Sequence, residues 1–365
     1  MSTSETSLVL QQSSRAVRIW IITGIIMVFL QIVIGGVTRL TGSGLSITRW
    51  EVVTGTIPPL SQADWEEAFA LYQQTPQYHK INRGMSLGEF KFIYFWEYFH
   101  RLWARLMFFV FVFPFAWFWW KGLLNPVVRR RLLIVVLLAG LEGFFGWIMV
   151  ASGLIKRPWV NAYNLTLHLS MGILIFAYLL WTYFIARQPR PSDRLEPRWR
   201  KFGWWMVGIA FFQIALGAMM SGTKAGLFFP TWPDMQGMFL PGLLLDGSKW
   251  TGDSFIHYDT DPFVPALIQF LHRNTAYLLT GMVLYYFWNL RKLPVSATLR
   301  TGLWVLLVAL GIQVLLGILT LINCIASVPV TLGVLHQAGA VVLLGVLLYV
   351  VYQSAPVAGS TKRGN

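Results

Sequence analysis

Cysteine and charge are both scarce in this sequence. Cys324 is the sole cysteine among 365 residues, which excludes an intramolecular disulfide, a CxxC heme-attachment motif and a cysteine zinc site. Charged residues make up 12% of the chain and hydrophobic residues 56%, so a water-soluble domain of this length would lack polar surface. The composition is typical of an integral membrane protein with many spans, and the expected fold class is all-α.

Residues 1–14 lack the features of a targeting segment. They contain Glu5 and no arginine, which fits neither an arginine-rich transit peptide nor a signal sequence with a basic start. We therefore expect a bacterial plasma membrane rather than an organelle. A mature mitochondrial form without its presequence stays open.

Eight apolar segments are long enough to cross a bilayer, which takes about 20 helical residues. They cover residues 17–38, 92–120, 132–151, 163–186, 202–221, 264–290, 302–321 and 330–352. A polar surface helix is also expected in the first long connection, at SQADWEEAFALYQQ (61–74), because a serine at its start and acidic residues in its first turns favour a helix N-terminus.

The net charge of +14 does not indicate nucleic-acid binding, because the basic residues gather in short connections on alternate sides of the membrane. They are Arg15, Arg18, Lys121, Arg129, Arg130, Arg131, the six basic residues from Arg187 to Lys201, Arg291, Lys292, Arg300, Lys362 and Arg363. The positive-inside rule then places both termini in the cytoplasm. The long connections of mixed charge face outward.

The two halves of the chain repeat one pattern. QIVIG (31–35) resembles QIALG (213–217), EYFHR (97–101) resembles QFLHR (269–273), EGFFG (142–146) resembles QVLLG (313–317), and NLTLHLS (164–170) resembles TLGVLHQ (331–337). Because each half has four spans, an even number, both halves enter the membrane in the same orientation, as a parallel repeat. We expect two four-helix bundles, formed by residues 1–190 and 191–365.

Four histidines lie at repeated positions inside the apolar segments. They are His100, His168, His272 and His336. A metal-ligating group inside a membrane span is costly unless it is paired or coordinated. The second and fourth spans of a half run parallel, so each pair of imidazoles could bind a heme iron from its two faces, near the outer surface. Interhelical hydrogen bonding is the alternative for any single histidine, but it does not require matched depth in both halves.

One titratable group distinguishes the first half from the second. Glu97 lies three residues before His100 and so on the same helix face, whereas the second half has Gln269 at the matched position. This carboxyl could move a proton or offset positive charge on a reacting carbon. An ion pair with Arg101 or Arg105 is the structural alternative.

Four arginines are candidates for binding heme propionates, which need cationic partners in a partly dry site. They are Arg39, Arg101, Arg105 and Arg273. Pairing with neighbouring acidic groups, or extension of the side chain to the membrane interface, would explain them equally well.

The runs EFKFIYFWEYFHR (89–101) and GGVTRLTGSGLSI (35–47), together with the paired histidines and the duplication, resemble the heme A synthase family over nearly the whole chain. The resemblance implies an enzyme that oxidises a ring methyl of heme O to a formyl group by successive hydroxylations, giving heme A for cytochrome oxidase. It implies that His100 and His168 belong to the heme O site, that His272 and His336 hold a resident heme b, and that Glu97 is the family's essential glutamate.

The same resemblance implies association with the heme O farnesyltransferase and with oxidase assembly factors. Some members carry a cysteine pair in each long outer loop; this chain resembles the subgroup without them, and no redox role is expected for Cys324. The exposed aromatic spans are compatible with a homo-oligomer in the lipid membrane.

Two other functions stay open. A diheme cytochrome that oxidises quinol also uses four paired histidines, but it moves electrons across the bilayer and therefore needs hemes at opposite depths. A heme transporter or chaperone would bind heme without changing it, and product analysis would separate it from an enzyme.

Overall fold

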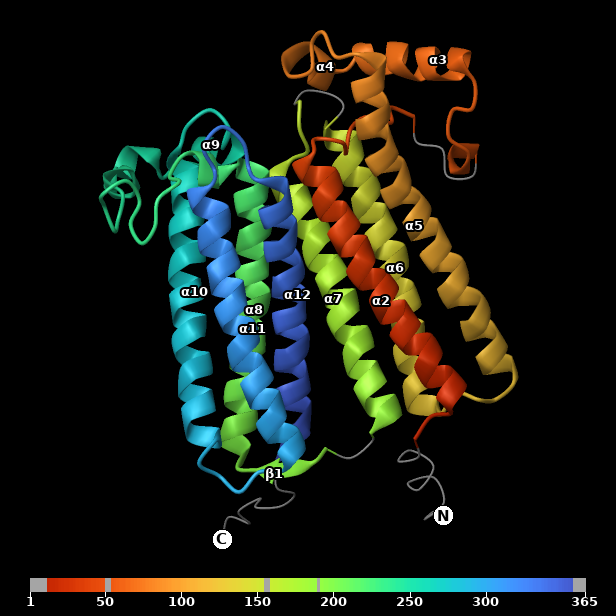
Figure 1. Cartoon of the computed structure of the whole chain (residues 1–365), viewed down its shortest axis with the longest axis vertical. Helices are drawn as coiled ribbons and strands as arrows, with labels where there is room; N and C mark the ends of the chain where they lie inside the picture. The colour runs from red at the N-terminus through yellow and green to blue at the C-terminus, as the bar shows by residue number, and fades with distance from the viewer. Residues whose placement is uncertain (1–11, 50–53, 154–157, 189–190, 357–365) are drawn as a thin grey trace.

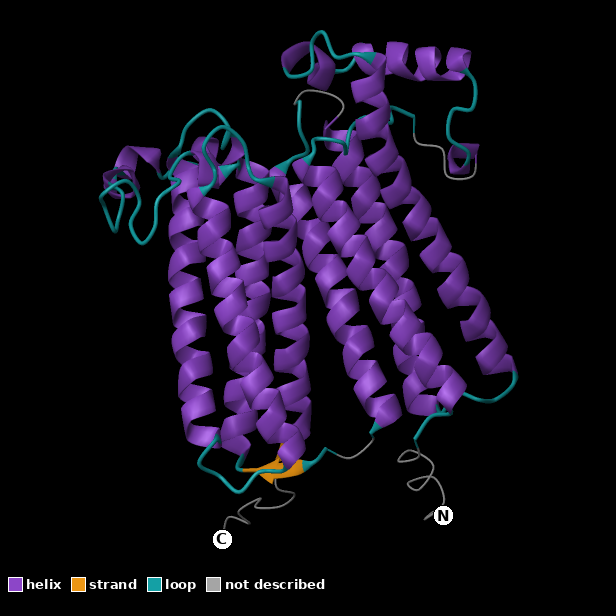
Figure 2. Cartoon of the chain, in the orientation of Figure 1, coloured by secondary structure: helices purple, strands orange, loops and turns teal. Residues whose placement is uncertain are grey.

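The computed structural model describes residues 12–49, 54–153, 158–188 and 191–356, and these ranges are mostly helical (Figure 2). The long helices are α2 (Arg15–Leu40), α5 (Leu87–Trp120), α6 (Pro126–Gly153), α7 (Ala162–Arg187), α8 (Pro197–Thr223), α10 (Phe263–Leu290), α11 (Ala297–Ile322) and α12 (Val330–Gln353). Each predicted apolar segment lies inside one of them. Lys362 and Arg363 lie outside the described residues.

Within the described ranges, seven helices are long and apolar enough to cross a membrane, namely all of the long helices except α10. Helix α10 has 28 residues and lies beside the others (Figure 1), but its sequence is more polar. The protein is therefore a helical, multi-pass membrane protein. Its α5 begins earlier than the apolar segment does, because Ser86 and Glu89 form a capping box at Leu87.

The connections carry short elements. On the side that carries the long loops are α3 (Gln62–Gln73), α4 (Pro76–Lys80), α9 (Gly252–Ile256) and the 3-10 turns η1 (Thr54–Thr56), η2 (Ala225–Leu227), η3 (Gly242–Leu245) and η4 (Gly247–Lys249). The predicted surface helix is confirmed as α3, which Ser61 and Asp64 cap reciprocally.

The helical fold class is confirmed, with one addition: a small parallel sheet of two short strands. Strand β1 (Asp193–Leu195) pairs with β2 (Ser354–Pro356), with Asp193 opposite Ser354. The Oε1 atom of Gln353 accepts hydrogen bonds from the backbone N–H of Ser192 at 3.1 Å and from its hydroxyl at 2.8 Å. The connection between α7 and α8 is thereby fastened to the end of α12, at the end of the bundle where α2 begins (Figure 1).

The long helices pack in two groups (Figure 1). In one, α2 packs against α5 and α7, and α6 packs against the same two helices. In the other, α8 packs against α10 and α12, and α11 packs against those two. Contacts of α7 with α8, of α2 with α12 and of α7 with α12 join the groups.

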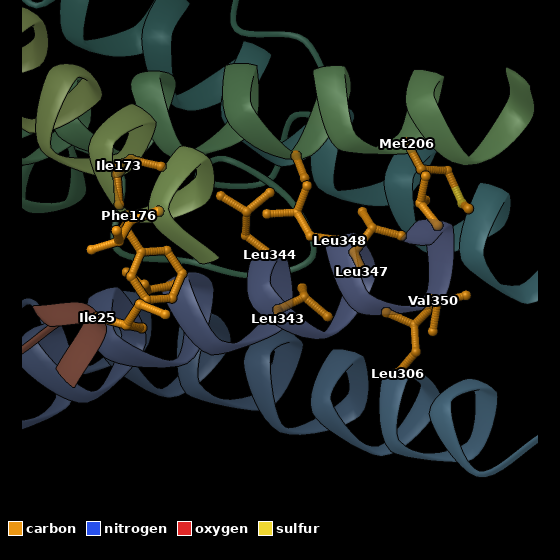
Figure 3. Packing of buried hydrophobic residues seen from close by; sticks show 14 of the residues in the cluster. Ile25, Ile173, Phe176, Met206, Leu306, Leu343, Leu344, Leu347, Leu348 and Val350 are labelled. Atoms are coloured by element: carbon orange, nitrogen blue, oxygen red, sulfur yellow. The ribbon is translucent and has the colours of Figure 1, made fainter. Parts of the chain in front are cut away.

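One hydrophobic core crosses the contact between the two groups. Ile173 and Phe176 of α7, Met206 of α8 and Leu344 and Leu347 of α12 belong to the same buried cluster (Figure 3). The groups therefore share their core, and this shared packing fixes how the ends of α2, α7, α8 and α12 meet.

The contact between α8 and the start of α7 depends on a missing side chain. A Cβ added at Gly222 would lie 2.6 Å from the Cβ of Ala162, whereas one at Gly208 on the same helix would meet nothing within 4 Å. Overpacking costs about 1–3 kcal/mol. We expect Gly222→Ala to lower the unfolding temperature in detergent and Gly208→Ala to leave it unchanged or raise it slightly. Equal unfolding temperatures for the two variants would contradict this packing.

Candidate functional site

All four membrane histidines are seated in the same way: each ring lies over a glycine of a neighbouring helix. A Cβ added at the glycine would meet Cε1 of the ring at 3.0 Å for Gly35 and His100, 3.2 Å for Gly146 and His168, 3.2 Å for Gly217 and His272, and 2.8 Å for Gly317 and His336. These distances are shorter than ordinary van der Waals contact, so a side chain at any of the four glycines would push the ring from its place, most strongly at Gly317. The glycines that the rings contact thus lie in the odd-numbered apolar segments, and the histidines lie in the even-numbered ones.

The rings of His272 and His336 form a close pair. The ring centres of His272 and His336 are 6.4 Å apart, with an angle of 76° between the planes. Two imidazoles on one metal stand about 6 Å apart, centre to centre, when each nitrogen lies about 2.0–2.1 Å from the metal. His100 and His168 lie on α5 and α7, and each of these helices packs against both α2 and α6. Two imidazoles on parallel helices suit a heme iron as ligands. The four histidines therefore have the chemistry that heme binding requires.

Polar side chains one turn from the glycines contact the histidines. Nε2 of Gln31 donates to the backbone carbonyl of His100 at 3.2 Å. Nε2 of Gln313 donates to the carbonyl of His336 at 3.0 Å and lies 3.0 Å from its Nδ1. These two glutamines were not among the site residues expected from the sequence. The repeated spacing Gln-x3-Gly could have revealed them, because residues i and i+4 share one helix face.

Glu97 is buried, with 2% of its surface exposed, and is held by polar contacts. Its Oε2 accepts hydrogen bonds from the hydroxyl of Ser46 and the N–H of Ile47, both at 2.8 Å. Its Oε1 forms an ion pair with Arg101. The carboxylate is therefore held one turn from His100. The ion pair with Arg101, which was the structural explanation for Glu97 considered from the sequence, is present.

In the second half, Gln269 contacts the matched loop with the opposite polarity to Glu97, while Arg273, like Arg101, donates to loop carbonyls. Nε2 of Gln269 donates to the carbonyl of Phe229 at 2.7 Å, where Glu97 accepts from the N–H of Ile47. Arg273 donates to the carbonyls of Thr231 and Pro233, both at 2.8 Å. Each half thus fastens the loop after its first helix to its second helix, and only the first half does so with a carboxylate.

The candidate propionate ligands have other partners in the described structure. Arg101 donates to the carbonyl of Ile47 at 3.3 Å, and Arg39 donates to the carbonyl of Ser221 at 2.8 Å, from α2 to α8. Arg105 lies on α5 as well, one turn beyond Arg101. Together with Arg273, these arginines lie at the histidine-bearing end of the helices, and propionate binding by them stays a prediction.

Cys324 lies in the connection between α11 and α12, away from this chemistry. Its Sγ donates to the carbonyl of Thr320 at 3.2 Å, and burial raises the pKa of its thiol. A buried thiol that stays protonated is a poor nucleophile and a poor redox group.

Comparison with known proteins shows the family. The family model COX15-CtaA, described as cytochrome oxidase assembly protein, matches residues 18–348. Relatives named heme A synthase include those of Bradyrhizobium sp. (strain ORS 278), at 39% identity over 91% of this chain and 90% of the relative, and of Rhizobium meliloti, at 42% over 92% and 89%. A third, from Flavobacterium psychrophilum, is 38% identical over 94% of this chain and 99% of the relative. The resemblance found in the sequence is confirmed, and the chain belongs to the COX15-CtaA family of cytochrome oxidase assembly proteins.

Proposed function

We propose that this chain is a heme A synthase, an oxidoreductase that converts heme O to heme A by oxidising a ring methyl to a formyl group. The observation that carries the proposal is the set of four histidines whose rings lie over glycines, two of which have ring centres 6.4 Å apart, in a chain that resembles enzymes of this name along nearly all of its length. An electron-transferring diheme cytochrome is not favoured by these relatives.

We also propose that the chain is a duplication with eight membrane spans, α10 being the sixth, and that residues 1–190 and 191–365 are its two halves. The helix contacts support this, because each group has the same set of neighbours in the same order. The contact between α2 and α12 mirrors the contact between α8 and α7, as a two-fold axis along the membrane normal would require. Arg39 and Ser221, which occupy matched positions, meet across that axis.

His100 and His168 would bind the substrate heme O, and His272 and His336 would hold a resident heme b. When bound, the heme iron supplies the redox chemistry. The chain itself supplies ring positions, through the glycine seats, and a fixed negative charge, through Glu97. That carboxylate is preorganised by Ser46, Ile47 and Arg101, so it can offset positive charge on the reacting carbon or accept its proton without rearrangement.

The surroundings follow from the same proposal. The protein would lie in a bacterial plasma membrane with both termini in the cytoplasm, so that the histidine-bearing ends of the helices face outward. Its partners would be heme O, the heme O farnesyltransferase and oxidase assembly factors, with self-association as a further expectation.

The role of Glu97 can be tested by Glu97→Gln, which gives the first half the residue that Gln269 provides in the second. We expect heme to remain bound while heme A formation falls by about 10²–10⁴-fold, the usual contribution of a positioned acid or base. The measurement is mass analysis of extracted hemes after expression with a heme O supply.

A matched control separates charge from loop attachment. Ser46→Ala removes one hydrogen bond to the same carboxylate but keeps the charge, so we expect heme A formation to fall far less than in Glu97→Gln. Equal losses in the two variants would show that Glu97 acts by holding the loop.

A further inference from the structure

One position in the repeated pattern departs from the other three. Gln31, Gln213 and Gln313 each stand four residues before a histidine-seating glycine, and Glu142 stands at the corresponding place on α6. Glutamine can donate a hydrogen bond, and Gln31 and Gln313 both donate to the carbonyl of a histidine. A carboxylate has only acceptor atoms, so Glu142 must contact its histidine differently.

Glu142 of α6 and His168 of α7 contact each other between the two helices. Oε1 of Glu142 lies 3.1 Å from Nδ1 of His168. The His168 ring lies over Gly146, one turn along α6, and the Glu142 carboxylate lies over Gly172, one turn along α7, where an added Cβ would stand 3.3 Å from Oε1. The other oxygen, Oε2, and Nδ1 of His168 are both buried without a hydrogen bond within the described ranges. The two groups are therefore in close polar contact, and a small rotation of either side chain would complete a hydrogen bond between them.

A carboxylate in this position determines which ring nitrogen carries the hydrogen. A carboxylate oxygen 3.1 Å from Nδ1 favours a hydrogen on that nitrogen over a lone pair, because two lone pairs facing each other repel. The lone pair of the ring is then left on Nε2, the nitrogen available to a metal. Hydrogen bonding of a ligating histidine to a carboxylate orients the ring and makes it a stronger electron donor. Gln313 at His336 supplies no formal charge for this purpose.

We propose that Glu142 is a positioning residue that acts through His168 and makes the first-half heme site more electron-donating than the second. The proposal rests on the proposed function, since it takes His100 and His168 as heme ligands. A stronger donor stabilises ferric iron, so the first-half heme has a lower reduction potential than it would have with a glutamine at position 142.

The first test is a redox titration of the purified full-length protein, made with heme bound in the first half, in a His336→Ala background that leaves this site alone. Glu142→Gln, which is nearly isosteric, is expected to raise the midpoint potential and to change the electron paramagnetic resonance signal of the low-spin heme. The reciprocal control, Gln313→Glu in a His100→Ala background, is expected to lower the potential of the remaining heme. Unchanged potentials in both variants would overturn the proposal.

The second test needs neither heme nor turnover. In heme-free protein labelled with ¹⁵N-histidine, the His168 signal, assigned by its loss in His168→Ala, is expected to report the Nδ1–H form in the wild type and a mixture or the Nε2–H form in Glu142→Gln. An Nε2–H form in the wild type overturns the role of Glu142 while leaving the proposed function intact. Failure of the wild type to bind heme in its first half would instead remove the proposed function.

Discussion

His336→Ala is expected to remove one heme per chain and to reduce heme A formation by more than about a hundredfold, since loss of a group that merely supports a metal ligand already costs 10–100-fold. His336 lies 6.4 Å, ring centre to ring centre, from His272, and in the proposed heme b site alanine would remove one of the two histidines that hold the heme. The measurement is the heme-to-protein ratio of the purified variant, determined from the spectrum of its pyridine complex.

The matched control for this variant is His257→Ala. His257 lies in the long loop between α8 and α10, where its Nδ1 is 2.9 Å from Oδ1 of Asp253, and we expect its removal to leave the heme ratio unchanged. If His336→Ala also kept the wild-type ratio, the membrane histidines would be interhelical contacts rather than heme ligands.

The second large effect is expected from Gly317→Val. A Cβ at this position would lie 2.8 Å from Cε1 of His336, the closest of the four seats, so the ring must leave its place or the helices must separate. Overpacking of about 1–3 kcal/mol corresponds to roughly 5–150-fold weaker heme binding at the second-half site. Heme retention during dilution measures the difference.

Gly311→Val is the control for helix propensity, because Gly311 lies on the same α11 and an added Cβ there meets nothing within 4 Å. Both variants place a β-branched residue in the same helix, so only the contact with His336 differs. Equal heme retention in the two variants would contradict the seating of the histidine on Gly317.

The helices and the candidate histidines could be predicted from the sequence because both depend on local patterns. Apolar length marks a span whatever its neighbours are, and an imidazole in such a span stands out against hydrocarbon. The internal repeat also predicted the depth of the histidines in the membrane and their grouping in pairs, because equivalent residues of equivalent helices lie at the same level. Glu97 could be predicted from the same comparison, because it is the acidic residue at the position where the second half has Gln269.

Contacts between segments far apart in the chain could not be predicted from local patterns. The carboxylate of Glu97 is held by Ser46 and Ile47, in a loop whose path no periodicity predicts. The pairing of β1 with β2 joins the middle of the chain to its end, and three-residue strands carry no pattern. Glu142 was visible beside Gln313 in the aligned halves, but its meaning depended on the 3.1 Å contact with His168.

The most direct test of the central claim is mass analysis of hemes extracted from the purified wild-type protein after expression in cells that supply heme O. We predict heme A beside heme b, with the amount of heme A falling in Glu97→Gln. Heme b alone, at two equivalents per chain in both proteins, would contradict the synthase and indicate an electron carrier.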